Sequence, residues 1–79
     1  MRSIKILPSK KWPGFWKSYE APGVEPAFAE PDAKRKAIDY ASQRFGGSSG
    51  EVHVYDPAGA TIERKIIIDG RGQYQKARE

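Results

Sequence analysis

Residues 31–59, PDAKRKAIDYASQRFGGSSGEVHVYDPAG, carry the strongest pattern in this chain of 79 residues. Apolar side chains recur at helical spacing through residues 31–45, which predicts an amphipathic helix. Pro31 suits the first helical position, because its missing N–H would be unpaired there. Gly46 and Gly47 follow the last apolar residue, and Gly46 is a natural left-handed cap. The predicted inner face of this helix consists of Ala33, Ala37, Ile38, Tyr40, Ala41 and Phe45.

The segment that follows the helix predicts a β-hairpin closed by the sequence DPAG at residues 56–59. A type I turn with Gly59 in the left-handed conformation gives a three-residue loop with a bulge. This register places Val52, Val54, Ile62 and Ile66 on the core face, with Arg64 at a rim. The expected cross-strand pairs are Tyr55–Thr61, Val54–Ile62, His53–Glu63, Val52–Arg64 and Glu51–Lys65.

Two further strands precede the helix. Alternating apolar residues predict a strand at residues 2–7, and an aromatic-rich segment predicts a second at residues 15–20. A short extended piece is expected near residues 27–29. The predicted fold class is α+β: a single domain in β-β-α-β-β order, with a four-stranded, largely antiparallel sheet and one helix packed on one face. We expect this domain at residues 1–69, followed by a polar C-terminal tail at residues 70–79.

The composition limits the range of functions. The chain contains no cysteine, and its formal net charge is +4. A chain of this length is expected to form one thin core, which leaves no room to enclose a cofactor, so we predict none. Without cysteine there is no disulfide framework and no thiolate metal site, and a cytoplasmic location is favoured. No apolar stretch is long enough for a membrane span, so we expect no membrane partner.

Basic residues are concentrated in the first part of the chain. Residues 1–19 contain five Lys or Arg and no acid, whereas residues 20–33 contain four acids and no base. A basic segment attracts nucleic acid or an anionic surface. The acidic segment that follows can equally neutralise it, and both interpretations stay open at this point.

Within this basic part, residues 10–19 are the candidate binding surface. Four aromatic residues interleave with three lysines there. Stacking platforms flanked by cations are typical of proteins that hold single-stranded nucleic acid. The candidate binding residues are Lys10, Lys11, Trp12, Trp16 and Lys17.

The same aromatic residues also fit a core. Strand alternation places Phe15, Lys17 and Tyr19 on one face, and Trp16 and Ser18 on the other. Small domains use large aromatic side chains to fill their cores. The alternative is therefore that Phe15 or Trp16 packs beneath the helix while the lysines keep the turn soluble.

Catalytic constellations are not visible in the sequence. His53 is the only histidine, and a His53–Glu63 pair lacks both a nucleophile and a third group. The glycine-rich residues 46–50 follow a helix and lack a phosphate-loop signature, so we interpret them as a connector. We predict that the protein is not an enzyme and holds no metal.

The three consecutive isoleucines at residues 66–68 indicate a strand that is buried on both faces, or an exposed strand edge at Ile67 that associates with another chain.

Taken together, these features predict a small non-enzymatic domain that acts as a protein-binding or accessory module, with an unknown protein or a second copy as partner. The alternative is a nucleic-acid-binding module that uses the basic aromatic residues 10–19 and binds weakly.

The order of these motifs resembles a group of short bacterial domains of unknown function. In such domains an aromatic strand near Gly-Trp precedes an Ala-rich helix, a Gly-Gly pair and a hairpin that ends in Asp-x-x-Gly. The resemblance implies the β-β-α-β-β order, and it implies no activity and no catalytic residue. The matching residues are Gly14-Phe15-Trp16, Ala37-Ile38 with Ala41, Gly46-Gly47, and Val52-His53-Val54-Tyr55-Asp56 with Gly59.

Overall fold

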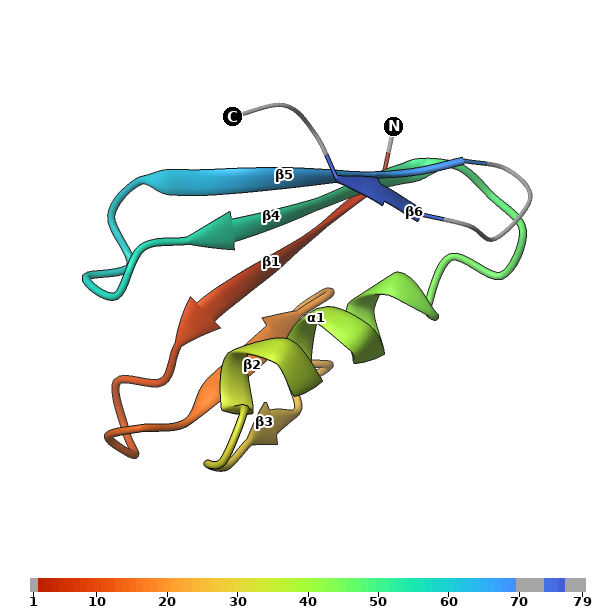
Figure 1. The fold of residues 1–79 in the computed structure, drawn as a ribbon. Coiled ribbons are helices and arrows are strands. Elements are labelled where there is room, and N and C mark those ends of the chain that lie inside the picture. Colours follow the sequence, from red (N-terminus) through yellow and green to blue (C-terminus); the bar gives the residue numbers. More distant parts are fainter. Residues whose placement is uncertain (1, 70–73, 77–79) are drawn as a thin grey trace.

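The computed structural model describes residues 2–69 and the backbone of residues 74–76. Its radius of gyration is 11.8 Å, close to the value of about 12 Å expected for one compact domain of this length. The elements, drawn in Figure 1, are β1 (Arg2–Pro8), β2 (Trp16–Tyr19), β3 (Ala27–Phe28), α1 (Ala33–Ser42), β4 (Gly50–Tyr55), β5 (Ile62–Ile68) and β6 (Tyr74–Lys76).

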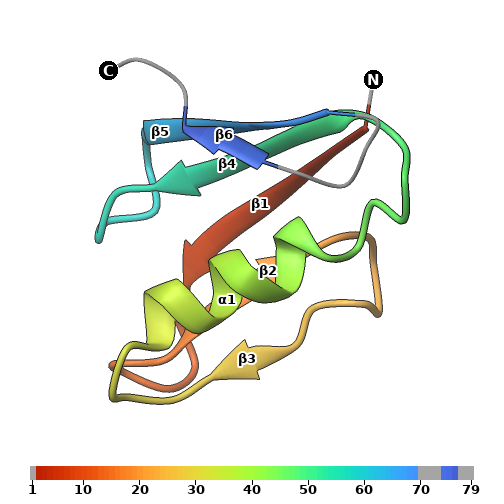
Figure 2. The same ribbon diagram turned by 45° about the vertical axis from the view of Figure 1, so that its right-hand side comes forward.

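The strands form one mixed sheet in the order β3-β2-β1-β4-β5-β6. β1 pairs antiparallel with β2 and parallel with β4, whereas every other neighbouring pair is antiparallel. β4 runs parallel to β1 because α1 carries the chain back along the sheet before β4 begins. Figure 2 shows that α1 lies on one side of the sheet, over the half that contains β1, β2 and β3.

The core lies between α1 and the sheet face that it covers. Ile4 and Ile6 are fully buried on this face, as the alternation of β1 predicts. Ala37 and Ala41 are also fully buried, and their small side chains let the helix approach the sheet closely. Trp16 and Phe28 pack against the margin of this core. The buried cluster consists of Ile4, Ile6, Ala37, Ile38, Ala41, Phe45, Val52, Val54, Ile66 and Ile68.

The helix is shorter than the sequence predicts. It begins at Ala33 and ends at Ser42, whereas residues 31–45 were expected. Asp32 precedes the helix with a positive φ of 58°, which places Pro31 outside the first turn. Gly46 has the predicted left-handed conformation. The predicted inner face is confirmed for Ala33, Ala37, Ile38, Ala41 and Phe45, which are buried, while Tyr40 is half-buried.

The predicted fold class is confirmed in its main features, a single α+β domain with one helix on one face, but the predicted sheet is incomplete. It has more than four strands, because β3 adds a two-residue edge strand within residues 27–29 and β6 pairs with β5. It is mixed and not simply antiparallel, because β1 and β4 are parallel. Of the expected tail at residues 70–79, only β6 is described, and the rest lies outside the described residues.

The predicted register of the last hairpin is wrong. Val54 pairs with Arg64 and not with Ile62, and Val52 pairs with Ile66. The register shifts between Val54 and Tyr55, and this shift marks a β-bulge. Ile62 consequently leaves the core face, where it was expected, and is 40% exposed. Ile66 and the half-buried Arg64 keep their predicted places, in the core and at its rim.

The side chain of Asp56 explains the different register. Its Oδ1 accepts a hydrogen bond from the N–H of Ala60 at 2.9 Å, and its Oδ2 accepts one from the hydroxyl of Thr61 at 2.8 Å. The backbone N–H of Asp56 also donates to the carbonyl of Thr61 at 2.9 Å. These bonds close a longer loop than the three-residue one expected, although Gly59 has the predicted positive φ, 71°.

Candidate binding site

The sheet face opposite α1 carries the charged side chains of β1 and β2. Because Ile4 and Ile6 point into the core, Lys5 and Leu7 point to this second face. In β2 the buried residue is Ser18, so its neighbours Lys17 and Tyr19 lie on the same open face. The predicted division of β2 into two faces is therefore confirmed.

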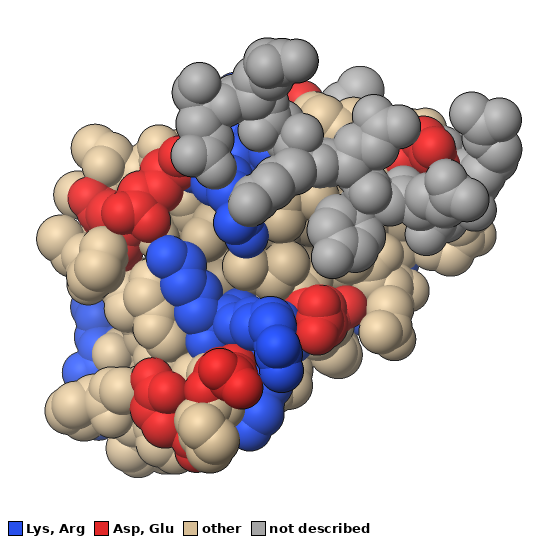
Figure 3. Space-filling model, in the orientation of Figure 1, with Lys and Arg blue, Asp and Glu red and all other residues tan. Residues whose placement is uncertain are grey.

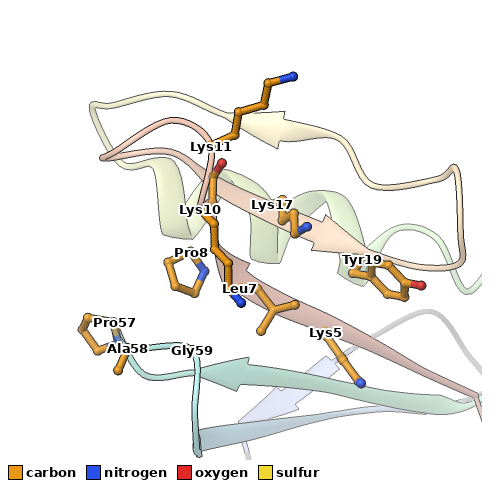
Figure 4. A pocket seen from close by; sticks show the side chains of 11 residues that line it. Lys5, Leu7, Pro8, Lys10, Lys11, Lys17, Tyr19, Pro57, Ala58 and Gly59 are labelled. Atoms are coloured by element: carbon orange, nitrogen blue, oxygen red, sulfur yellow. The ribbon is translucent and has the colours of Figure 1, made fainter.

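A shallow hollow of about 610 Å³ lies on this open face (Figure 4). β1, the loop after it and β2 form most of its lining, and the turn at residues 57–59 closes one end. Leu7 and Tyr19 give the hollow an apolar floor. Figure 4 shows Leu7 between the side chains of Lys10 and Lys5, while the side chain of Lys11 points away from them. Its lysines are Lys5, Lys10, Lys11 and Lys17.

Two of these lysines have partners, and one of the two partners is a carboxylate that offsets the charge. Lys17 Nζ lies 2.9 Å from Glu25 Oε1. Glu20 also pairs with Arg2, so two acids of the segment 20–33 fold back onto the basic segment. Lys11 Nζ lies 5.1 Å from the centre of the Trp12 ring. Among residues 2–69, whose side chains the structure describes, neither Lys5 nor Lys10 forms an ion pair. The hollow therefore holds positive charge that the described part of the chain does not neutralise.

The opposite side of the molecule has a different charge pattern. On the side seen in Figure 3, Lys and Arg side chains lie among Asp and Glu side chains. Ion pairs of this kind include Lys34 with Glu63 at 3.2 Å. Glu20 bridges Arg2 and Arg44, with 2.9 Å between Glu20 Oε1 and Arg44 Nε. The hydrogen bond that Glu20 accepts from Arg44 holds the pKa of the Glu20 carboxyl below its ordinary value.

The two candidate tryptophans lie on different parts of the molecule. Trp12 is 49% exposed in the loop after β1, and its ring centre is 5.7 Å from that of Phe15. Trp16 lies on the helix side of the sheet, where it packs against the core and Lys34 Nζ is 5.0 Å from its ring centre. Neither tryptophan lines the hollow. The structure thus brings together Lys10, Lys11 and Lys17 of the predicted surface, and it separates them from Trp16.

Two residues of this site were not among the candidate binding residues: Lys5, which lies outside the predicted surface 10–19, and Tyr19, which lies at its end. Lys5 lies between two core isoleucines in β1. Because successive side chains of a strand point to opposite faces, the sequence already predicts that Lys5 points to the open face. Its proximity to the other lysines depends on the pairing of β1 with β2, in which Lys5 is the partner of Tyr19. That pairing is the signal that would have identified both residues.

A row of side chains continues across the open face from this point. Lys5 of β1 is the cross-strand partner of Tyr19 in β2 and of His53 in β4. His53 is in turn the partner of Lys65 in β5. Aromatic and cationic residues therefore alternate across four neighbouring strands, in the order Tyr19, Lys5, His53, Lys65.

His53 has a different acidic partner from the one predicted. Its Nε2 lies 2.7 Å from Oε1 of Glu51 on the same strand, while Glu63 contacts Lys34 on the other side of the sheet. The hydrogen bond with His53 is the main reason that the pKa of Glu51 is below its ordinary value. No group of three or more His, Cys, Asp or Glu residues suited to a metal ion exists within the described ranges.

No helix in the part of the chain that the structure describes has the length and apolar character needed to cross a membrane. Comparison of the chain with models of protein families, with curated proteins and with solved structures finds no match. The resemblance to short bacterial domains therefore stays a prediction, and the proposals below rest on the chain's own residues.

Proposed function

We propose that this domain is a non-enzymatic binding module that holds an anionic partner on the open face of its sheet. One observation carries this proposal: lysines from two strands and a loop gather around one hollow. Lysine side chains repel one another when they gather without counter-charges, and a cleft of one sign raises the local concentration of opposite charge. Since Lys5 and Lys10 have no acidic partner in the described residues, an external anion is the natural complement.

The anionic groups can be the phosphates of a nucleic acid or the carboxylates of an acidic protein segment. Both classes share the chemistry that the hollow offers, which is ammonium donors above an apolar floor. We include in this proposal a cytoplasmic location, which the cysteine-free composition favours.

A charge-reversal pair tests this proposal. Lys10→Glu places a carboxylate at the hollow, whereas Lys36→Glu makes the same change in net charge at an exposed position of α1. The probes are a glutamate-rich peptide and a single-stranded oligonucleotide of about twelve nucleotides, with dissociation constants measured at about 50 mM and about 200 mM salt. We expect at least one probe to bind, with an affinity that falls in Lys10→Glu and changes little in Lys36→Glu. Absence of binding to both probes at low salt, or equal losses in the two variants, would contradict the proposal.

A second candidate is contact with another protein through β5, with a second copy of the chain as partner. Ile62 and Ile67 are 40% and 39% exposed on the open side of this strand. Exposed β-branched residues near a sheet edge favour association between like chains. The oligomeric state of the protein in solution tests this candidate.

A further inference from the structure

The alternation of rings and cations on the open face narrows the class of partner. Neighbouring strands lie about 4.8 Å apart, so Tyr19 and His53, separated by β1, stand about 10 Å apart on either side of Lys5. Tyr19 lines the hollow, and Lys17 Nζ lies 5.9 Å from its ring centre. The hollow thus combines an aromatic ring with ammonium groups at its rim.

An acidic peptide would use only half of this arrangement. Its carboxylates would pair with the lysines, but it would leave the Tyr19 ring without a function. Every nucleotide carries both a phosphate and a planar base, and bases stack on aromatic side chains whatever their sequence. The pairing of Tyr19 with Lys5, Lys10 and Lys17 therefore fits a nucleotide chain better than a chain of carboxylates.

The shape of the face favours a single strand over a duplex. The major groove of B-form DNA admits a helix or a two-stranded ribbon, whereas here the rings lie on the face of a wider sheet. The bases of a duplex are stacked on one another and cannot reach Tyr19. An unpaired strand presents free bases, as in proteins that bind RNA or DNA strands on an open sheet.

Two carboxylates limit the extent of the site. Glu25 is paired with Lys17, and Glu51 lies beside His53, the third residue of the row. A backbone of phosphates would avoid Glu51, so the favourable path runs over the hollow toward the turn at residues 57–59. This footprint accommodates a few nucleotides and corresponds to modest affinity.

We infer that the partner is a single-stranded nucleic acid, with a base stacked on Tyr19 and phosphates held by Lys5 and Lys10. This inference rests on the proposed function, because it assigns a chemical class to the anionic partner of the same hollow. It differs from a site built on the tryptophans of residues 10–19, since Trp16 lies on the other side of the sheet and Trp12 outside the hollow.

The experiment compares Tyr19→Leu, Tyr19→Phe and Trp12→Leu in the full chain. The single-stranded oligonucleotide is titrated into each, with the matching duplex and the glutamate-rich peptide as further probes. Loss of one stacked base lowers affinity by about fivefold to 150-fold, so we expect a loss in this range for Tyr19→Leu. Tyr19→Phe keeps the ring and is expected to bind as the unaltered protein does. Trp12→Leu removes an exposed ring outside the hollow and is expected to bind equally well.

A second variant tests the phosphate contact of Lys5, and a folding measurement accompanies every variant. Lys5→Gln changes an exposed side chain and is expected to reduce the slope of log affinity against log salt by about 0.7, the value for one phosphate contact on a single strand. Thermal unfolding followed by circular dichroism shows whether each variant folds.

Several outcomes would overturn the inference. Peptide binding without oligonucleotide binding would do so while leaving the proposed function intact, and so would equal affinity for single strand and duplex. Tyr19→Leu with unchanged oligonucleotide affinity would also overturn it, as would a loss confined to Trp12→Leu. An unchanged salt slope in folded Lys5→Gln would remove Lys5 from the site and overturn it too. Absence of binding to every probe would remove the inference and the proposed function together, and so would equal losses of affinity in Lys10→Glu and Lys36→Glu.

Discussion

Ser18 donates a hydrogen bond from its Oγ to the backbone carbonyl oxygen of Ala37 over 2.6 Å, and both residues are fully buried. This bond joins β2 to α1 through the apolar core. A buried hydroxyl costs free energy unless it is paired, so Ser18 is tolerated there because the helix lies at this distance. The same contact fixes which face of β2 points inward and therefore which face presents Lys17 and Tyr19.

Loss of this hydroxyl should weaken the domain. We expect Ser18→Ala to lower the free energy of unfolding by about 1 kcal/mol, the net value of one intramolecular hydrogen bond. Urea unfolding followed by circular dichroism measures the change. Ser3→Ala, at an exposed position of β1, is the matched control and should stay within about 0.5 kcal/mol of the original protein. Equal stability of Ser18→Ala and Ser3→Ala would show that the bond contributes nothing.

Gly50 is a position where a side chain does not fit. A Cβ atom there would lie 2.5 Å from the carbonyl oxygen of Arg2 and against the ring of Phe45. We expect Gly50→Ala to lower the free energy of unfolding by about 1–3 kcal/mol, the usual cost of overpacking. The measurement is the urea midpoint. In a Phe45→Leu background the added cost should be smaller, because only the clash with the Arg2 backbone remains. Unchanged stability in Gly50→Ala would contradict this close packing.

The Asp56 carboxylate makes the stability of the last hairpin depend on pH. Hydrogen bonds from the Ala60 N–H, and then from the Thr61 hydroxyl, lower the pKa of Asp56 below its ordinary value. The unfolded chain therefore binds this proton at a higher pH than the folded chain does, and the free energy of unfolding falls as the pH falls below about 4. We expect the stability difference between the original protein and Asp56→Asn to be largest near neutral pH and to shrink with acidification. Urea unfolding at a series of pH values measures this difference.

Thr61→Val tests the same carboxylate with one hydrogen-bond donor removed. It removes the hydroxyl donor at 2.8 Å but leaves the backbone donor of Ala60 at 2.9 Å. Its pH dependence should lie between those of the original protein and Asp56→Asn. A difference between the original protein and Asp56→Asn that stays constant with pH would show that the carboxylate does not titrate differently in the folded state.

Self-association through β5 predicts a dependence on concentration. If Ile67 is buried against a second copy, Ile67→Lys should raise the dimer dissociation constant by about tenfold or more, given the roughly 1.5–3 kcal/mol gained on burying such a side chain. Sedimentation equilibrium over a range of concentrations measures it. Val24→Lys, which alters another exposed apolar residue, is the control. A monomer at the highest concentration would rule out this second candidate.

Local patterns were sufficient to predict the inner face of β1 and most of the inner face of α1. The alternation of Ile4 and Ile6, and the helical spacing of Ala37 and Ala41, follow from the need to bury one face of each element. These predictions hold because each depends only on residues close in sequence. The same reasoning explains why Trp16 and Ser18 were expected on one face, although it could not show which face the helix covers.

The errors arose where distant or side-chain interactions decide the outcome. The hairpin register depended on the Asp56 side chain, whose bonds to Ala60 and Thr61 lengthen the loop. Turn rules based on backbone conformation alone did not include them. The parallel pairing of β1 with β4 joins Arg2 to Gly50, and no local pattern encodes that contact.

The candidate site was predictable in part for the same reason. Lys10, Lys11 and Lys17 were identified because they cluster in the sequence. Lys5 was missed because it joins them only through the pairing of β1 with β2. Trp16 was included because spacing along a strand does not reveal that it packs against the core.

The central position of β1 also has a consequence for how the protein is made. β1 is synthesised before β2 and β4, yet it acquires its second neighbour only when β4 has emerged from the ribosome, with Ile6 paired to Val54. At about 5–20 residues per second, this wait lasts roughly 2–10 s. During that interval the growing chain exposes the isoleucines of β1 beside an unpaired strand edge, a state prone to aggregation. Nascent chains of this protein are therefore expected to need protection by chaperones until the second half of the sheet has been synthesised.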